Sequence, residues 1–166
     1  MNGYLALILT GHVPYVRAAG REPEGEDLLH TTIADALVPT LNALFDLREL
    51  GLRPVVALAY SPVLLEQLAD SVVQKHFVVW MERHLARLEQ EAARWDTEGQ
   101  AHNAYLARFY LEWGSGILES FIGRYSRNLT AALRELCANG TAEPLAGTHI
   151  GIPSALAPAL KGVKPM

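Results

Sequence analysis

Polar residues follow three short apolar runs of this sequence, at the points where each run ends. Thr10 and His12 follow the first run, Ser61 follows the second, and Thr148 and His149 close the third. Hydroxyl and imidazole groups donate and accept hydrogen bonds at neutral pH, so together they could bind a polyhydroxylated ligand. If the three runs are parallel strands, these residues meet at one end of a sheet, where such folds bind ligands.

Each of these residues also has a purely structural explanation. A single histidine near a strand end is more often a polar residue with ordinary partners than a ligand contact, and this applies to His12 and His149 alike. Ser61 precedes Pro62, a pair typical of a helix N-cap and the first helical residue, so helix capping is the stronger expectation for Ser61. The remaining histidines lie in helical stretches and are expected at the surface or its boundary: His30, His76, His84 and His102.

Other kinds of site find little support in the sequence. His12 and His149 could supply two ligands to zinc, but zinc takes three or four, and the sequence has neither a cysteine pair nor an H-E-x-x-H motif. G-x-G-x-x-G, P-loop and G-x-S-x-G motifs are absent as well. We therefore predict no metal and no cofactor. The tryptophans lie in helical stretches, where packing is a more common role than stacking on a sugar: Trp80, Trp95 and Trp113.

The elements that must position these residues alternate between strands and helices. Short apolar runs bounded by turn residues predict strands at 4–9 and 54–60, and a third short strand leads from Glu143 to His149. Arg17 to Asp27 is predicted to be a loop. Helical spacing predicts helices at 28–50, from Ser61-Pro62 onward, at 75–94 and at 101–136. This order predicts an α/β fold with a parallel sheet or barrel, in one domain spanning residues 1–166.

Glycine and proline predict where the helices are interrupted. Pro39 should kink the first helix or split it in two. Glycines in the last long helix predict at least one break: Gly114, Gly116 and Gly123. Asn139-Gly140 should end that helix.

The composition restricts the partners and the compartment. The chain has 166 residues, of which 50% are apolar and 19% charged, and its net charge is −4. This balance argues against nucleic acid and against an anionic membrane surface, because both require clustered Lys and Arg. A single cysteine, Cys137, is typical of a reducing compartment. The apolar run near the N-terminus is too short for a signal peptide or a membrane span, so we expect a cytoplasmic protein.

Five segments, in order, resemble glycoside hydrolase family 57, and especially its 1,4-α-glucan branching enzymes. They cover essentially the whole chain: GYLALILTGHVPYVR (Gly3–Arg17), GREPEGEDLLHTTIADALVPTLNAL (Gly20–Leu44), LAYSPVLLEQLAD (Leu58–Asp70), ARFYLEW with the later RYSRNLTAALREL, and AGTHIGIP (Ala146–Pro153). The resemblance implies the first three βα units of a (β/α) barrel. It also implies that His12 and His149 match the histidines of two family motifs in the active-site region.

The sequence departs from the family pattern at the expected site. The family's first motif is His-x-His-Leu-Pro, and Thr10 replaces its first histidine. In the second motif, Ile150 follows His149 and the glycine comes one residue later. The family's nucleophilic Glu and acid/base Asp lie on later barrel strands, so we expect a chain that ends at Met166 to lack both, and we nominate no catalytic residue.

These observations lead to two hypotheses. In the first, the chain is the N-terminal, substrate-side segment of an α-glucan branching enzyme, with His12, His149, Thr10 and Ser61 at the glucan site, and it is inactive without the missing part. Its expected partners are α-glucan and a complementing C-terminal segment or a second copy of the chain. It would then be a shortened gene product, half of a split enzyme or an engineered fragment. In the second, it is a non-catalytic remnant, or a module that binds glucan or protein. A metal-dependent deacetylase-like fold using His12 and His149 is a minor third possibility.

Overall fold

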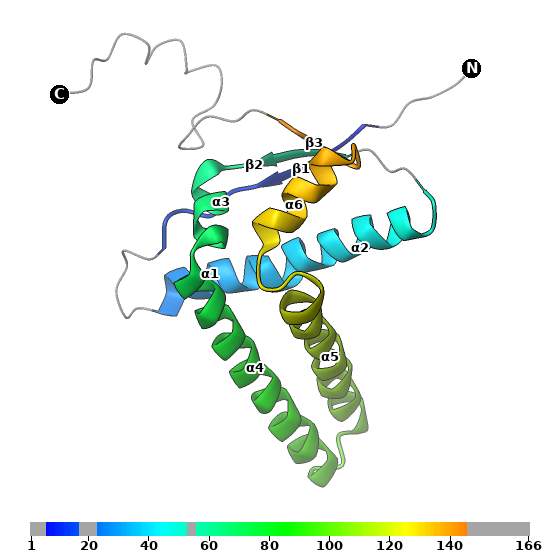
Figure 1. The fold of residues 1–166 in the computed structure, drawn as a ribbon. Coiled ribbons are helices and arrows are strands. Elements are labelled where there is room, and N and C mark those ends of the chain that lie inside the picture. Colours follow the sequence, from blue (N-terminus) through cyan, green and yellow to red (C-terminus); the bar gives the residue numbers. More distant parts are fainter. Residues whose placement is uncertain (1–5, 17–22, 53–55, 146–166) are drawn as a thin grey trace, which may run out of the picture.

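A computed structural model describes residues 6–16, 23–52 and 56–145 (Figure 1). Its sheet contains β1 (Leu7–Gly11), β2 (Val56–Tyr60) and β3 (Ala142–Pro144), in the order β1-β2-β3. Both strand pairs are parallel, as predicted, with Gly11 opposite Tyr60 and Ala57 opposite Glu143. The first strand ends later than predicted, since Thr10 and Gly11 belong to it, and β3 begins before Glu143.

Helices connect the strands. Between β1 and β2 the chain forms α1 (Pro23–Thr32), the π-helical turn η2 (Ile33–Leu37) and α2 (Val38–Glu49). Between β2 and β3 it forms α3 (Pro62–Ala69), α4 (Ser71–Thr97), α5 (Ala101–Glu119), the π-helical turn η3 (Ser120–Arg124) and α6 (Leu129–Ala138). The loop predicted up to Asp27 is therefore wrong in its second half. Proline at a first helical position, followed by acidic residues, favours a helix start at Pro23.

Pro39 does not split the first helix, contrary to one of the two outcomes predicted for it. The residues of α1, η2 and α2 follow one another without a gap, and η2 ends at Leu37, shortly before Pro39. In this wide turn the backbone N–H of Val38 donates to the carbonyl of Ile33, five residues back. A π-helical turn absorbs the misfit of the proline ring and its missing N–H, so the helix continues through it.

The predicted helix ends are partly confirmed. Ser61 caps α3, and Gly140, with a φ of +75°, follows the end of α6. The expected break in the last long helix exists, and it comes shortly after Gly123, which lies in η3. Gly114 and Gly116 lie inside α5, and the helix is interrupted only after η3.

The core lies on one face of the sheet. Leu9 and Leu58 face this side and pack with buried residues of the long first helix, such as Leu29, Ile33 and Leu41. Residues 26–49 of that helix are long and apolar enough to cross a membrane, but half of an apolar 18-residue window in this segment is buried inside the fold, as in a core helix. The labelled helices all lie on the same side of the sheet (Figure 1).

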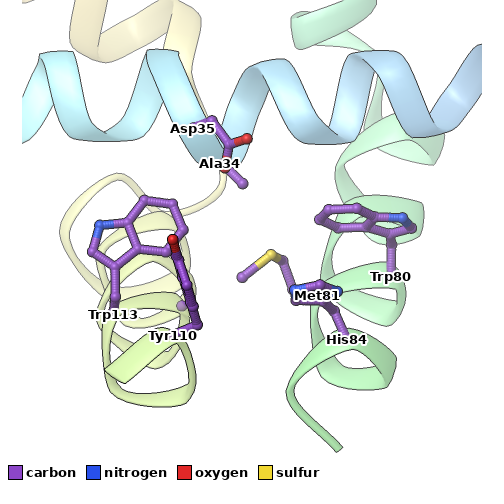
Figure 2. A pocket seen from close by; sticks show the side chains of 8 residues that line it. Ala34, Asp35, Trp80, Met81, His84, Tyr110 and Trp113 are labelled. Atoms are coloured by element: carbon purple, nitrogen blue, oxygen red, sulfur yellow. The ribbon is translucent and has the colours of Figure 1, made fainter. Parts of the chain in front are cut away.

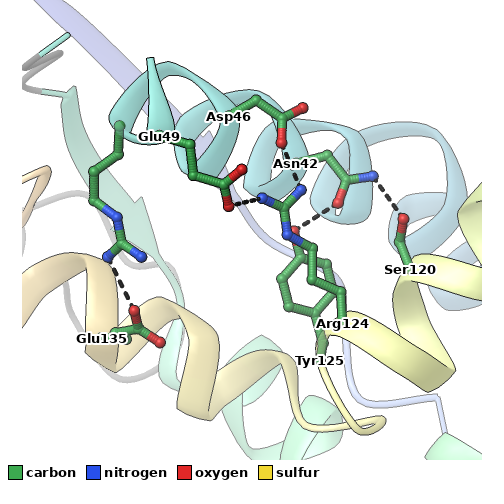
Figure 3. A network of polar contacts seen from close by, with 8 residues as sticks. Asn42, Asp46, Glu49, Ser120, Arg124, Tyr125 and Glu135 are labelled. Carbon is green, nitrogen blue, oxygen red and sulfur yellow. Dashed lines mark hydrogen bonds and ion pairs between the residues drawn. The ribbon is translucent and has the colours of Figure 1, made fainter. Parts of the chain in front are cut away.

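A polar network joins α2 to η3 and to the turn before α6 (Figure 3). Asn42 donates to the hydroxyl of Ser120 at 3.0 Å and accepts from the hydroxyl of Tyr125 at 2.6 Å. Beside them, Arg124 bridges two carboxylates of α2. These contacts hold the end of the α4–α5 hairpin against the helix that supports the sheet.

Candidate functional site

The carboxyl ends of β1 and β2 lie side by side, as the sequence predicts. The backbone N–H of Ser61 donates to the carbonyl of Gly11 at 2.9 Å, which extends the pairing of the two strands by one residue. Thr10, in β1, and His12, directly after it, are both exposed. Their side chains are therefore accessible at the end of the sheet where a ligand would bind in a parallel α/β fold.

A buried glutamine fixes the loop that carries His12. The side chain of Gln67, on α3, is 2% exposed. Its Oε1 accepts from the backbone N–H of Val16 at 2.9 Å, and its Nε2 donates to the carbonyl of Pro14 at 3.2 Å. Val13 and Val16 of the same loop are buried. The residues after His12 are thus held by α3, which limits where the imidazole can lie.

Sequence reasoning missed Gln67, although its position carried a signal. It follows Leu64 by three residues and precedes Leu68, so helical spacing places it on the buried face of α3. A buried amide must find hydrogen-bond partners, and an adjacent loop with free backbone groups provides them.

The side chain of Ser61 caps the N-terminus of α3. It is 8% exposed, and its hydroxyl accepts from the N–H of Leu64 at 3.3 Å, so the predicted N-cap is confirmed. Its hydroxyl proton is not used in that bond. A contact between Ser61 and a ligand stays a prediction.

The second face of the sheet carries a mixed set of side chains. Because neighbouring strand residues point to opposite faces, this face presents Ile8 and Thr10 of β1, Ala57 and Ala59 of β2, and Glu143 of β3. Ile8, Thr10 and Glu143 are exposed. Glu143 was not singled out as a candidate. Glu143 pairs with Ala57. On the same face, Ala59 follows Ala57 by two residues and pairs with Thr10.

Two predicted site residues, Thr148 and His149, lie outside the described residues. The predicted meeting of His12 with His149 is therefore untested. Within the part of the chain that the structure describes, no group of three or more His, Cys, Asp or Glu side chains is placed to hold a metal ion.

His30 corrects one expectation. It was predicted at the surface or its boundary, but it is 3% exposed, and neither ring nitrogen has a hydrogen-bond partner. Its ring lies 6.0 Å from that of Phe77 and 5.5 Å from that of Trp80. Burial lowers the pKa of His30, opposed by the nearby Glu26 and Asp27 carboxylates. The helical period that put Leu29 and Ile33 in the core also turns His30 partly inward.

Comparisons with known proteins agree with the resemblance. No protein-family model matches the chain. It is 31% identical over 157 residues to the 1,4-α-glucan branching enzyme of Thermococcus kodakarensis, covering 92% of this chain and 22% of that enzyme. It is 27% identical over 156 residues to a probable 1,4-α-glucan branching enzyme of Mycobacterium tuberculosis, covering 87% of this chain and 30% of that protein.

Solved structures give the same result. The family 57 branching enzyme of Pyrococcus horikoshii superposes with a TM-score of 0.81 at 31% identity, covering 90% of this chain and 28% of that one. The Thermococcus branching enzyme, crystallised with glucose, gives 0.79 at 28% identity, covering 90% and 26%. An α-amylase of Thermotoga maritima gives 0.75 at 25% identity, covering 87% and 27%.

The chain thus spans less than a third of the length of the relatives it matches. Its similarity extends over nearly all of its own residues and includes both sequence and fold. The chain is a homologue of the glycoside hydrolase family 57 branching enzymes, and it corresponds to a minor part of their length, consistent with an N-terminal segment.

Proposed function

We propose that the chain is the N-terminal, substrate-side segment of an α-glucan branching enzyme and that it has no transfer activity alone. The observation that carries the proposal is the exposed pair Thr10 and His12 at the strand end of a fold homologous to these enzymes. His12 and Thr10 would bind sugar hydroxyls, and His149 would join them. Like its relatives, the completed protein would act on α-glucan, and we place it in the cytoplasm.

The one-sided packing of the sheet supports a barrel arc. A barrel keeps its helices on the outside and fills its interior with side chains from the strands. Here the helices lie on one side (Figure 1). The other face, with Ile8, Thr10 and Glu143, would then face the barrel interior. Three strands do not close a barrel, so this face would be covered by further strands supplied by other residues.

The expected inactivity rests on the catalytic groups that this chemistry requires. Retaining glycosidases use two carboxyl groups about 5–5.5 Å apart, one as the nucleophile and one as the acid/base. In the family these groups lie on later strands. A branching enzyme must also shield its glycosyl intermediate from water until a glucan hydroxyl attacks, which requires a closed acceptor site. In this proposal, the chain contributes substrate contacts and one wall of that site.

The test is complementation. The purified 166-residue chain is mixed with amylose, with and without a second polypeptide that carries the remaining barrel strands of a family 57 branching enzyme, and branching is followed by iodine staining. We expect activity only in the mixture. Turnover by the chain alone would contradict the proposed inactivity. Failure of every combination, with the chain folded and binding glucan, would favour the non-catalytic binding module.

A matched pair of variants tests the site. His12→Ala should abolish the complemented activity while leaving the thermal stability of the chain unchanged, because the imidazole is exposed. His102→Ala, also exposed but on α5, should leave the activity intact. Equal effects of the two variants would show that His12 has no special role.

A further inference from the structure

Two hollows lie on one side of the α4–α5 hairpin, away from the strand ends. The larger, of about 360 Å³, is lined by Leu88, Glu91, Trp95, Asn103, Leu106, Ala107 and Tyr110. The smaller, of about 40 Å³, includes Asp35, Trp80, His84, Tyr110 and Trp113 in its lining (Figure 2). Tyr110 lines both hollows, so they are neighbours along the hairpin. We call the two together the hairpin groove.

We propose that the hairpin groove is a second α-glucan-binding site, separate from the strand-end site. That the sugar is an α-glucan rests on the proposed function. That the groove binds a sugar chain at all rests on its own residues.

The lining has the chemistry that sugars require. All three tryptophans of the chain lie in the groove, together with Tyr110. Flat aromatic rings offer apolar area to the C–H faces of a pyranose ring. Among them stand groups that accept or donate hydrogen bonds: Asp35, His84, Glu91 and Asn103. A mostly apolar hollow with a few polar groups is the usual form of a small-ligand site.

The ring of Trp95 is already fixed in place. The guanidinium of Arg94 lies 4.2 Å from the centroid of this ring, and it pairs with Glu91 at 2.5 Å. A platform ordered before binding loses less conformational entropy when the ligand arrives. One face of Trp95 is thus held by Arg94, and the indole also lines the larger hollow.

Trp80 is fixed in a similar way, and it forms a wall of the smaller hollow. Its Nε1 donates to Asp27 at 2.8 Å, and its ring is stacked on His84, with centroids 5.5 Å apart and planes at 6°. His84 thus stacks on one face of the Trp80 ring, and the buried His30 packs against the same ring. Besides Trp95, the rings that can cover a sugar are Tyr110, 52% exposed, and Trp113, 38% exposed.

The dimensions favour a chain over a single sugar. The larger hollow, of about 360 Å³, is broadly open to solvent, as an extended ligand requires, whereas the smaller one has room for a hydroxyl group or a water molecule. The lining residues of α5 run from Asn103 to Trp113, about 15 Å of helix at about 1.5 Å per residue. A ligand that follows this line is longer than one pyranose ring. The exposed carboxylate of Asp35 disfavours an anionic polymer.

The test uses the full chain and maltoheptaose, with tryptophan fluorescence as the readout, because all three tryptophans lie in the groove. Maltoheptaose should change the emission in a saturable way, and a β-linked oligosaccharide of similar length should do so less. Tyr110→Ala should weaken binding at least about threefold, the loss expected for one aromatic contact. Tyr105→Ala is the matched control, because Tyr105 is 62% exposed on the same helix and lines neither hollow.

His12→Ala separates the two sites. Binding that is lost in Tyr110→Ala and retained in His12→Ala supports the groove, whatever the outcome of complementation. Binding that is lost in His12→Ala and retained in Tyr110→Ala overturns the groove and leaves the strand-end site standing. Absence of maltoheptaose binding also overturns it, as does a Tyr110-dependent dimer in sedimentation, since the aromatic surface would then be an interface between copies.

Discussion

The ring of Tyr60 fills the space beside Gly11 that a side chain at position 11 would occupy. A β-carbon on Gly11 would lie 2.7 Å from Cδ1 and 2.9 Å from Cε1 of Tyr60, and 3.2 Å from Cδ2 of Leu64. The first two distances are far below van der Waals contact. Glycine at the end of β1 therefore lets the aromatic ring of β2 pack against the backbone next to His12.

Gly11→Ala should destabilise the chain and displace the strand end. Forcing a methyl group into a packed site typically costs about 1–3 kcal/mol, because neighbours must leave their preferred rotamers. Urea unfolding measures the cost. Adding Tyr60→Ala should recover most of it, so the double variant should be little less stable than Tyr60→Ala alone.

Gly116→Ala is the matched control for this substitution. A β-carbon there meets nothing within 4 Å, and the residue lies inside α5. Alanine in a helix interior is more favourable than glycine by roughly 0.5–1 kcal/mol, so this variant should be more stable than the parent. If both alanines destabilise the chain equally, packing against Tyr60 is not the cause at position 11.

Gln67→Leu should loosen the loop after β1. The substitution keeps the apolar contacts of α3 but leaves the buried N–H of Val16 without its acceptor, at a cost of about 1–3 kcal/mol. We expect lower stability in urea and faster amide exchange at Val16. Glu66→Leu, at the neighbouring exposed position, should change stability by no more than about 0.5 kcal/mol. Unchanged exchange at Val16 in Gln67→Leu would contradict the clamp.

Local signals predicted those parts of the fold that depend on neighbouring residues. Ser61 caps α3 because serine before proline satisfies helix N–H groups within its own turn. Gly140 follows α6 because glycine adopts a positive φ without strain. The parallel sheet followed from alternating strands and helices, and the homology followed from motifs along the whole chain.

Features that depend on distant contacts were not predictable in the same way. Pro39 is accommodated by a π-helical turn. Gly114 stays helical although glycine weakens helices. A β-carbon there would lie 2.9 Å from Leu85 of α4, so glycine permits the close approach of the two helices. The burial of His30 depends on Phe77 and Trp80, which are far from it in sequence. Of the strand-end site, the placement of Thr10 and His12 was predicted, whereas the clamp by Gln67 was not.

Tyr125→Phe should cost more stability than Arg124→Met. The hydroxyl of Tyr125 donates a partly buried hydrogen bond to Asn42. Burial raises the pKa of Tyr125 to about 12. Its loss leaves Asn42 short of a donor, at about 1 kcal/mol. Arg124 pairs with Asp46 and Glu49, but both carboxylates are largely exposed, and such pairs contribute about 0–1 kcal/mol and weaken in salt. Urea unfolding at low and high salt measures both effects. A larger loss for Arg124→Met, unchanged by salt, would reverse this ranking.

His30 should make the chain less stable in mild acid. Burial lowers the pKa of His30 below its ordinary value of 6.5, so the folded state binds this proton less readily than the unfolded state. Its contribution to stability is therefore fully present above about pH 6.5 and is lost as the pH falls below that value toward the folded-state pKa. Glu26 and Asp27 oppose the shift, and His76 reinforces it.

The decisive comparison is the slope of stability against pH in three proteins. His30→Leu removes the buried imidazole, so its free energy of unfolding should fall less between pH 8 and pH 5.5 than that of the parent chain. His102→Gln replaces an exposed histidine on α5 and should keep the parental slope. Denaturant unfolding at each pH gives the values. A parental slope in His30→Leu would mean that the acid sensitivity comes from other groups. A flat slope in His30→Leu would identify His30 as the group whose protonation the folded core resists.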